Sequence, residues 1–392
     1  MATTPDRADA SSDPARLTGS RPADTRRRGP RRTSISDVAR HAGVSLGTVS
    51  NVLNRPDRVS ETTRERVQRA IEELSFIPNG SARQLRAGTI STVGAVLLDI
   101  ANPFFTEVAR GIEDRLSLDD YTLMLASSDG DVAREARYLR LFEEHGVLGV
   151  LVTPAGADLD HLLELRSRGV QVVLLDQTSP VADVSSVAVD DVAGAAMAVR
   201  HLVSLGHRRV GFINGPATIQ QCVDRRAGAL RALDEAGLGA SALVEVEVPA
   251  LNADGGEAGV TELLVGGTAP TALFCVNDLT ALGAMRTLRA HGLSIPDDMA
   301  VVGYDDVNFA SMLTTPLTSV RQPTHRLGEV AADLLLRGAG PDGAPAQHVQ
   351  FQPELVVRAS SGAAPSGTIA GDVAGAEGDE RVGGVPATET LR

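Results

Sequence analysis

Short apolar runs alternate with amphipathic stretches of helical length over most of this chain, a pattern that leaves few folds open. Seven runs have the composition of buried strands, at residues 93–100, 123–126, 147–153, 170–176, 210–214, 272–276 and 300–304. The stretches between them include residues 104–118 and 279–290. Repeats of strand, helix and strand predict parallel sheets with right-handed crossovers. The length of the repeat favours two doubly wound lobes over one.

The composition agrees with parallel sheets that are covered by helices. Hydrophobic residues make up 43% of the 392 residues, which is enough for buried cores in two or three domains. Aromatic residues make up only 3%, and there is no tryptophan. The cores are therefore built from Val, Leu, Ile and Ala, the residues that suit sheets buried on both faces.

The stretch at residues 33–54 precedes this pattern and has a helical one instead. Ser34 and Asp37 form a helix start that resembles a capping box, and Gly43 ends this first short helix. Ser45 can cap a second helix. The apolar residues of the first helix are Val38, Ala39 and Ala42, and those of the second are Val49, Val52 and Leu53. The spacing leaves the opposite face of the second helix free for other contacts.

A third helix is expected from Ser60 to Leu74, with Val67 and Ile71 turned inward. Three helices are enough to close a small core, and two of them joined by a glycine turn make a helix-turn-helix. The second helix of that motif fits the major groove of DNA. Spacing alone leaves another interpretation open, because short helical hairpins are also common in α-rich cores.

Several sequence motifs in this chain resemble the LacI/GalR family of bacterial transcription repressors. In the first 90 residues these motifs are ISDVARHAGVS, TVSNVLN, FIPN and ARQL. Further along they are NPFF at residues 102–105, GHRRVGFI at 206–213, DRRAG at 224–228, FCVND at 274–278 and VVGYDD at 301–306. The resemblance covers about residues 33–360. Several independent motifs in family order make a far more specific signal than the helical hairpin alone.

The resemblance implies an α plus α/β architecture. A three-helix DNA-binding head at residues 33–78 is followed by a hinge helix at 79–89 and by a two-lobe domain at 90–360, which is similar to periplasmic binding proteins. The chain crosses between the lobes three times, and we expect the crossings near residues 178–185, 317–322 and 338–346. Residues 1–32 and 361–392 have the composition of disordered tails, and the second shows no coiled-coil heptads.

Net charge differs between the two ends of the chain. The formal charge of the whole chain is −13, from 37 basic and 50 acidic residues, which by itself argues against nucleic acid. Residues 1–89 hold 16 Arg and 10 acidic residues, so the other 303 residues hold 21 and 40. A basic head on an acidic body predicts that only the head meets phosphate. The run RRRGPRR at residues 26–32 adds phosphate contacts or is simply a solvated tail.

The resemblance also assigns residues of the head to DNA. Positions that match the family's base-reading residues are Leu46, Gly47 and Asn51. Positions that match its contacts to the DNA backbone are Ser34, Ser45, Thr48, Ser50, Asn54, Arg58, Ser60 and Thr63. Leu46 can meet a thymine methyl group and Asn51 can bond adenine through two hydrogen bonds, whereas Gly47 offers no side chain. Many relatives have Arg at the position of Asn51, so the operator sequence is not given by the resemblance.

The segment at residues 79–86 resembles the family's hinge helix, which folds on the operator and pushes a leucine into the minor groove. Leu85 matches that leucine, with Ala82 beside it and Asn79 at the start of the segment. An apolar wedge of this kind unstacks a base step and kinks the duplex. An ordinary linker is the alternative.

A cleft between the two lobes, at the carboxyl ends of the strands, is the expected ligand site. Residues at matching strand ends, which the resemblance assigns to the effector, are Phe104, Phe105, Asp176, Arg225, Asn277 and Asp305. The aromatic rings supply a stacking wall, Asp and Asn accept hydroxyl hydrogens, and Arg binds ring or carboxylate oxygens. Each polar residue taken alone is more often a helix cap.

Other chemistry finds little support in the sequence. The two cysteines, Cys222 and Cys275, lack the spacing of zinc ligands, so we expect no metal and no cofactor. Residues 43–47 fit GxSxG but follow a helix instead of a strand, and residues 338–343 fit GxGxxG with a proline inside. No run is long enough to span a membrane and no signal peptide is evident, so we expect a cytoplasmic, nucleoid-associated protein.

Three classes of function are weighed against these observations. The first is a homodimeric transcription repressor on a pseudo-palindromic DNA operator, controlled by a small-molecule effector, which we expect to be a sugar. The second is a solute-binding receptor, against which the three-helix head and the absent signal peptide argue. The third is an enzyme, for which no nucleophile, base and orienting acid come together. A purine or a phosphorylated metabolite remains open as the effector.

Overall fold

The computed structural model describes residues 33–76, 91–265, 270–340 and 343–362. The chain divides into two compact units, Met1–Ala87 and Gly88–Arg392. We call the described part of the first unit the head and that of the second the body. The segment expected to form the hinge helix lies outside the described residues.

The head is the expected three-helix unit. Its elements are α1 (Ile35–His41), α2 (Leu46–Asn54), the short η1 (Pro56–Arg58) and α3 (Glu61–Glu73). Ser34 and Asp37 form the predicted capping box on α1, and Gly43 ends that helix region with a φ of +61°, which glycine adopts without strain. The three helices close around a small apolar core of Val38, Ala39, Ala42, Val49, Val52, Val67, Ala70 and Phe76.

The first lobe of the body is a six-stranded sheet in the order β11-β5-β4-β3-β1-β2. Its strands are β1 (Thr92–Leu97), β2 (Thr122–Ser127), β3 (Gly149–Val152), β4 (Gln171–Leu175), β5 (Ser185–Val189) and β11 (His348–Phe351). All neighbouring strands are parallel. The helices of this lobe are α5 (Pro103–Ser117), α6 (Val132–Glu144), α7 (Asp160–Ser167) and α12 (Thr324–Gly338).

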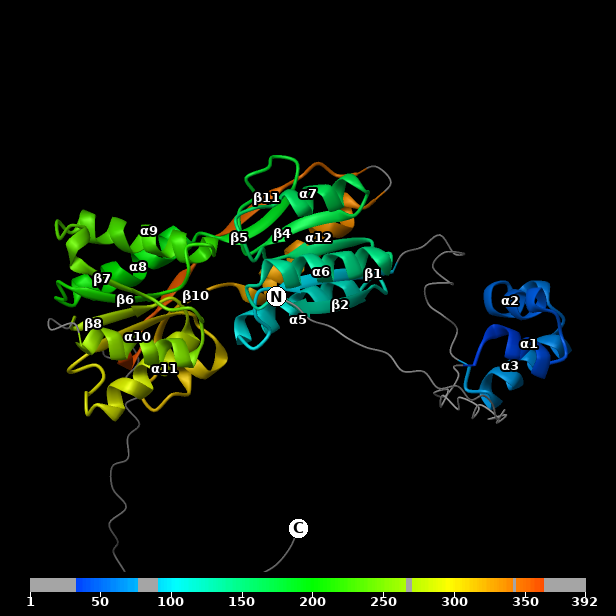
Figure 1. Cartoon of the computed structure of the whole chain (residues 1–392), viewed down its shortest axis with the longest axis horizontal. Helices are drawn as coiled ribbons and strands as arrows, with labels where there is room; N and C mark the ends of the chain where they lie inside the picture. Colours follow the sequence, from blue (N-terminus) through cyan, green and yellow to red (C-terminus); the bar gives the residue numbers. More distant parts are fainter. Residues whose placement is uncertain (1–32, 77–90, 266–269, 341–342, 363–392) are drawn as a thin grey trace, which may run out of the picture. The chain divides into compact units, whose positions relative to one another are not determined.

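The second lobe repeats this arrangement, with the strand order β12-β10-β9-β8-β6-β7. Its strands are β6 (Val210–Asn214), β7 (Leu243–Glu247), β8 (Ala272–Cys275), β9 (Ala300–Asp305), β10 (Thr318–Arg321) and β12 (Glu354–Val356). Only β12 runs antiparallel to its neighbour. The helices are α8 (Asp191–Ser204), α9 (Gln220–Glu235), α10 (Ala253–Val265) and α11 (Asp278–Ala290), with short η2 (Ala240–Ala242), η3 (Asn308–Ser311) and η4 (Ala359–Ser361). Figure 1 shows each sheet lying between helices.

All seven predicted strands are present as parallel strands of the two sheets, which confirms the doubly wound lobes. Two of the three predicted crossings between lobes are wrong. The first crossing lies at residue 190 instead of 178–185, because residues 185–189 still form β5 of the first lobe. The third lies at 352–353 instead of 338–346, because residues 348–351 form β11 of the same lobe. The second crossing, at 322–323, overlaps the predicted range 317–322 only at its end, because residues 318–321 form β10.

Helices of the body approach one another closely where glycines face them. In α12, an added Cβ on Gly328 would lie 2.1 Å from the backbone oxygen of Val108 in α5. At the end of the same helix, an added Cβ on Gly338 would meet only the side chain of Gln171, whose oxygen lies 3.4 Å away. Backbone oxygens cannot move aside as a flexible side chain can. No helix in the described part of the chain has the length and apolar character needed to span a bilayer.

We predict that Gly328→Ala destabilises the protein by about 1–3 kcal/mol, because the new methyl group forces α12 away from α5. Gly338→Ala is the matched control on the same helix, and we expect its effect to stay within about 0.5 kcal/mol. Urea unfolding followed by circular dichroism measures both. Equal stability of the two variants would show that the helices separate without cost.

Candidate functional site

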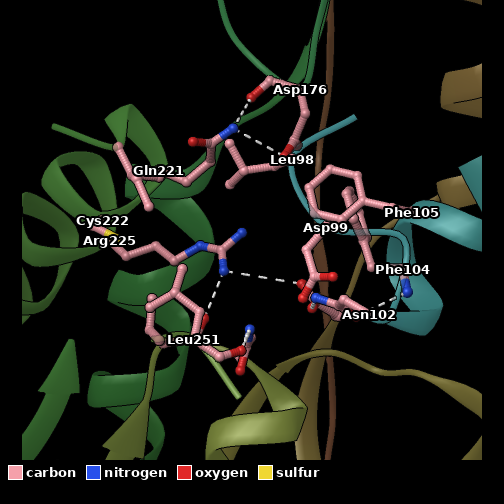
Figure 2. A pocket seen from close by; sticks show the side chains of 14 residues that line it. Leu98, Asp99, Asn102, Phe104, Phe105, Asp176, Gln221, Cys222, Arg225 and Leu251 are labelled. Atoms are coloured by element: carbon pink, nitrogen blue, oxygen red, sulfur yellow. Dashed lines mark hydrogen bonds and ion pairs between the residues drawn. The ribbon is translucent and has the colours of Figure 1, made fainter. Parts of the chain in front are cut away.

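Both lobes contribute to a buried pocket in the body. The pocket encloses about 50 Å³ and continues into a wider cleft of about 800 Å³, with which it shares Leu98, Asp99, Ile219 and Leu251. All six residues that the sequence assigned to an effector line the pocket, namely Phe104, Phe105, Asp176, Arg225, Asn277 and Asp305. Figure 2 shows Gln221 and Arg225 on one wall and Phe104, Phe105 and Asn102 on the opposite wall.

Two aspartates stand at strand ends with unusual backbone geometry. Asp176 follows β4 with a φ of 58°, and Asp305 ends β9 with a φ of 105°. Side chains other than glycine rarely adopt this left-handed region, and such strain is concentrated at binding sites. Both carboxylates are about 4% exposed. Among the described residues, Oδ1 of Asp176 has no hydrogen-bond partner, so a buried acceptor remains available at the pocket wall.

Arg225 is the cation of the pocket and is held from several sides. Its Nε donates to Oδ1 of Asp191 at 2.8 Å, and its Nη1 donates to the backbone oxygen of Val276 at 2.5 Å. The guanidinium carbon lies 3.6 Å from the centre of the Tyr304 ring, and Nη1 lies 3.9 Å from Oδ1 of Asp305. These contacts fix the plane of the guanidinium in one orientation.

Burial and charge shift the titration of these groups. Burial raises the pKa of the Asp305 carboxyl to about 6, although Arg225 and the side-chain amides of Asn102 and Gln322 act in the opposite direction. Burial, together with the charge of Asp191, also raises the pKa of Asp176 well above its ordinary value. Burial would lower the pKa of Arg225, but Asp191 and its neighbours raise it above the ordinary value, so the guanidinium stays charged.

The remaining predicted residues shape the walls. The rings of Phe104 and Phe105 meet edge to face, with their centres 4.9 Å apart. Asn277 caps α11, because its Oδ1 accepts from the backbone N–H of Thr280 at 2.8 Å, and its Nδ2 donates to the backbone oxygen of Leu251. The helix-cap interpretation therefore holds for Asn277, which lines the pocket as well.

Sequence reasoning missed part of the lining. Gln221 lies four residues before Arg225 on α9, and this helical spacing could have revealed it. Asn102 stood inside the NPFF motif but was not assigned a contact. The apolar residues of the lining could not be distinguished from core residues in the sequence. They are Leu98, Ile219, Cys222, Leu251 and Val276.

In the head, the three residues with predicted base contacts lie together on the exposed side of α2. Leu46 is 48% exposed, and Gly47 and Asn51 are also exposed. Val49 and Val52, on the opposite side of α2, are buried in the core of the head. A helix that packs one face into a core and leaves the other exposed can enter a groove of DNA.

Most of the predicted backbone contacts lie at helix N-termini. Ser34 caps α1, Ser45 caps α2 with its hydroxyl 2.9 Å from that of Thr48, and Ser60 precedes α3, where it donates to Thr63 at 3.0 Å. Backbone N–H groups at such ends bind phosphate well. Asn54 donates to the backbone oxygen of Ser50 at 2.8 Å, and Arg58 is exposed in η1. The predicted hinge residues Asn79, Ala82 and Leu85 lie outside the described residues.

The head itself is electrically balanced. Residues 33–76 contain six Arg and six Asp or Glu, so the basic excess of the first 89 residues comes from residues 1–32 and 77–89. Three pairs reduce the free charge further: Arg40 with Asp37, Arg64 with Glu61, and His41 with Glu73. Within the described ranges, no group of His, Cys, Asp and Glu side chains could hold a metal ion.

Comparison with known proteins gives a consistent result. Residues 34–79 match the model of the bacterial regulatory proteins of the lacI family, and residues 199–361 match that of a periplasmic binding protein-like domain. The HTH-type transcriptional repressor PurR of Photobacterium profundum is 33% identical over 333 residues, which cover 83% of this chain and 98% of that protein.

Two solved structures are also similar. The transcriptional regulator CelR in complex with cellobiose has 33% identity and a TM-score of 0.65, over 84% of this chain and 100% of that chain. The lac repressor dimer bound to operator and the anti-inducer ONPF has 28% identity and a TM-score of 0.70, over 84% and 99% of the two chains.

The raised pKa of Asp305 predicts a pH dependence of stability. A carboxyl whose pKa is about 6 in the folded state and 3.8 for an unperturbed aspartate stabilises the fold most below pH 4, and this contribution is lost as the pH rises through 6. Asp305→Asn removes the titration. We therefore expect the stability of Asp305→Asn relative to the natural chain to rise by up to about 2 kcal/mol between pH 4.5 and 7.5. Urea unfolding of both proteins measures this, and a difference that does not change with pH would contradict the assignment.

Proposed function

The chain belongs to the lacI family of bacterial regulatory proteins, and from that premise we propose a cytoplasmic repressor that binds a pseudo-palindromic operator as a homodimer and responds to a sugar in the pocket between its lobes. The observation that carries this proposal is the pocket itself. Its lining brings together acceptors, amides and one cation from both lobes, so a bound molecule contacts both and can change how they are arranged.

Charge favours an uncharged effector. Three carboxyl groups, those of Asp176, Asp191 and Asp305, surround one guanidinium that already binds Asp191. A phosphate group would bring further negative charge into a buried site whose lining, within the described residues, has no spare cation. Sugar hydroxyls instead donate hydrogen bonds to carboxylates such as Asp176, whose Oδ1 has no partner in the described part of the chain. The cellobiose bound to the similar CelR protein supports the same class of ligand.

The exposed side of α2 and the helix N-termini of the head support the DNA-binding part of the proposal. Leu46, Gly47 and Asn51 form an exposed patch on one helix, the kind of element that a major groove admits, and Ser34, Ser45 and Ser60 lie at helix ends suited to phosphate. A single head makes few contacts, and a dimer places two heads on two half-sites, which raises affinity through effective concentration. A solute-binding receptor for transport does not need a DNA-binding head, so the head argues against that alternative. The curated relatives are transcription regulators rather than enzymes.

Asn51→Ala should weaken binding to the operator by about 1–3 kcal/mol, because it removes a side chain that can bond a base edge through two hydrogen bonds. Gln68→Ala is the matched control, since Gln68 is an exposed amide on α3. Fluorescence anisotropy with a duplex selected from random sequences, and with a scrambled duplex, measures both variants. Loss of affinity for both duplexes alike would assign Asn51 to backbone contact instead.

A thermal-melt screen tests the effector class. We expect one or more free sugars to raise the melting temperature according to RT ln(1+[L]/Kd), while the corresponding sugar phosphates do not. Arg225→Leu should abolish the rise, because Arg225 orders the pocket carboxylates, and it should leave operator binding by the separate head unchanged. A rise only with phosphates or purines would discard the sugar and keep the regulator.

A further inference from the structure

The two sheets place equivalent residues at equivalent strand ends. In the strand orders of the two lobes, β4 corresponds to β9 and β1 corresponds to β6. Asp176 follows β4, and Asp305 ends β9. Asn102 lies between β1 and α5, and Gln221 lies in the first turn of α9, which follows β6. Each lobe therefore presents a carboxylate and a side-chain amide to the pocket from equivalent strands.

Each amide reaches across to the carboxylate of the other lobe. Nε2 of Gln221 donates to Oδ2 of Asp176 at 2.9 Å and to its backbone oxygen at 2.6 Å. Nδ2 of Asn102 donates to Oδ2 of Asp305 at 3.4 Å. Figure 2 shows the bonds from Gln221 to Asp176 at one end of the pocket. All four side chains are less than 8% exposed, so water competes little for these bonds.

Neighbouring contacts hold both pairs in place. Oδ1 of Asn102 accepts from the backbone N–H of Phe104 at 3.0 Å, which caps α5 and turns the NH2 group toward the other lobe. Asp305 also accepts at Oδ1 from Gln322, at 2.8 Å, and Gln322 lies in the second crossing between the lobes. The second pair is therefore tied to the crossing segment as well as to both lobes.

We propose that Asn102 and Gln221 are positioning residues that form two reciprocal latches, Asn102 with Asp305 and Gln221 with Asp176, which hold the lobes together. An effector competes for the same carboxylates by donating its own hydroxyl hydrogens, and it thereby replaces a direct link between the lobes with a link through the ligand. Only this last consequence rests on the proposed function, because the latches themselves need neither effector nor DNA.

Isosteric acid substitutions test the latches. Asn102→Asp keeps the cap on α5, and Gln221→Glu keeps the length of the side chain, but each sets a carboxylate against a carboxylate of the other lobe. Gln220→Glu is the matched control, because Gln220 is the adjacent residue and donates to Asp224 of the same helix at 2.9 Å, not across the cleft. All three variants add the same charge.

The lobe separation is measured in the full chain by electron–electron double resonance. Spin labels are attached to Ala133→Cys on α6 and Thr218→Cys before α9, both at exposed positions, while the natural Cys222 and Cys275 are buried. We expect each latch variant to lengthen or broaden the distribution of distances between the two labels. The double variant, with both substitutions, should do so further. The control should match the natural chain.

A distribution unchanged in the folded double variant would overturn the proposal. If the acid variants do not fold, Asn102→Ser and Gln221→Ala provide the same comparison without added charge, since Ser also caps a helix. Operator binding is assayed separately. An unchanged distance distribution in the latch variants, with operator binding by the natural chain intact, would reject this inference and keep the regulator. A longer distribution in the variants of a chain that binds no operator would keep the latches and reject the regulator.

Discussion

One buried guanidinium, that of Arg225, organises the pocket of this protein. A charge with 5% exposure is stable in the interior only if it is paired, and Asp191, the Val276 carbonyl and the Tyr304 ring supply that pairing. The charge of Arg225 in turn opposes the cost of burying Asp176 and Asp305, whose pKa values burial raises. Removing Arg225 would raise the pKa values of both carboxyls further, and a protonated carboxyl is a weaker acceptor for sugar hydroxyls than a carboxylate.

The fold could be predicted where buried segments show a recognisable apolar pattern in the sequence. The central strands of both sheets are buried on both faces, so their apolar runs stood out. Edge strands have a weaker apolar pattern, because part of each strand is exposed. β11 alternates exposed and half-buried residues, and β7 has two exposed residues and one buried residue. The third crossing was misplaced because the edge strand β11 was not recognised. The first crossing was misplaced because β5, an inner strand, begins with two serines and so did not stand out as an apolar run.

The six pocket residues named from the sequence line one pocket, because strand ends in a parallel sheet share one edge and the resemblance identified which ends mattered. The contacts across the pocket could not be predicted in this way. Asn102 and Asp305 are separated by 203 positions in the sequence, and Gln221 and Asp176 by 45. The hydrogen bonds between them depend on how the two lobes meet. The local sequence pattern does not reveal how the lobes meet, and it does not reveal the φ values of the two aspartates.

The account requires that the sugar pocket and the DNA-binding head share one equilibrium. The most direct test is to measure operator affinity with and without a saturating sugar, at one salt concentration, and sugar affinity with and without operator. Linkage predicts that operator affinity changes by some factor, and that sugar affinity changes by the same factor. A sugar that binds tightly but leaves operator affinity unchanged would contradict the account, because a ligand with equal affinity for both states shifts neither.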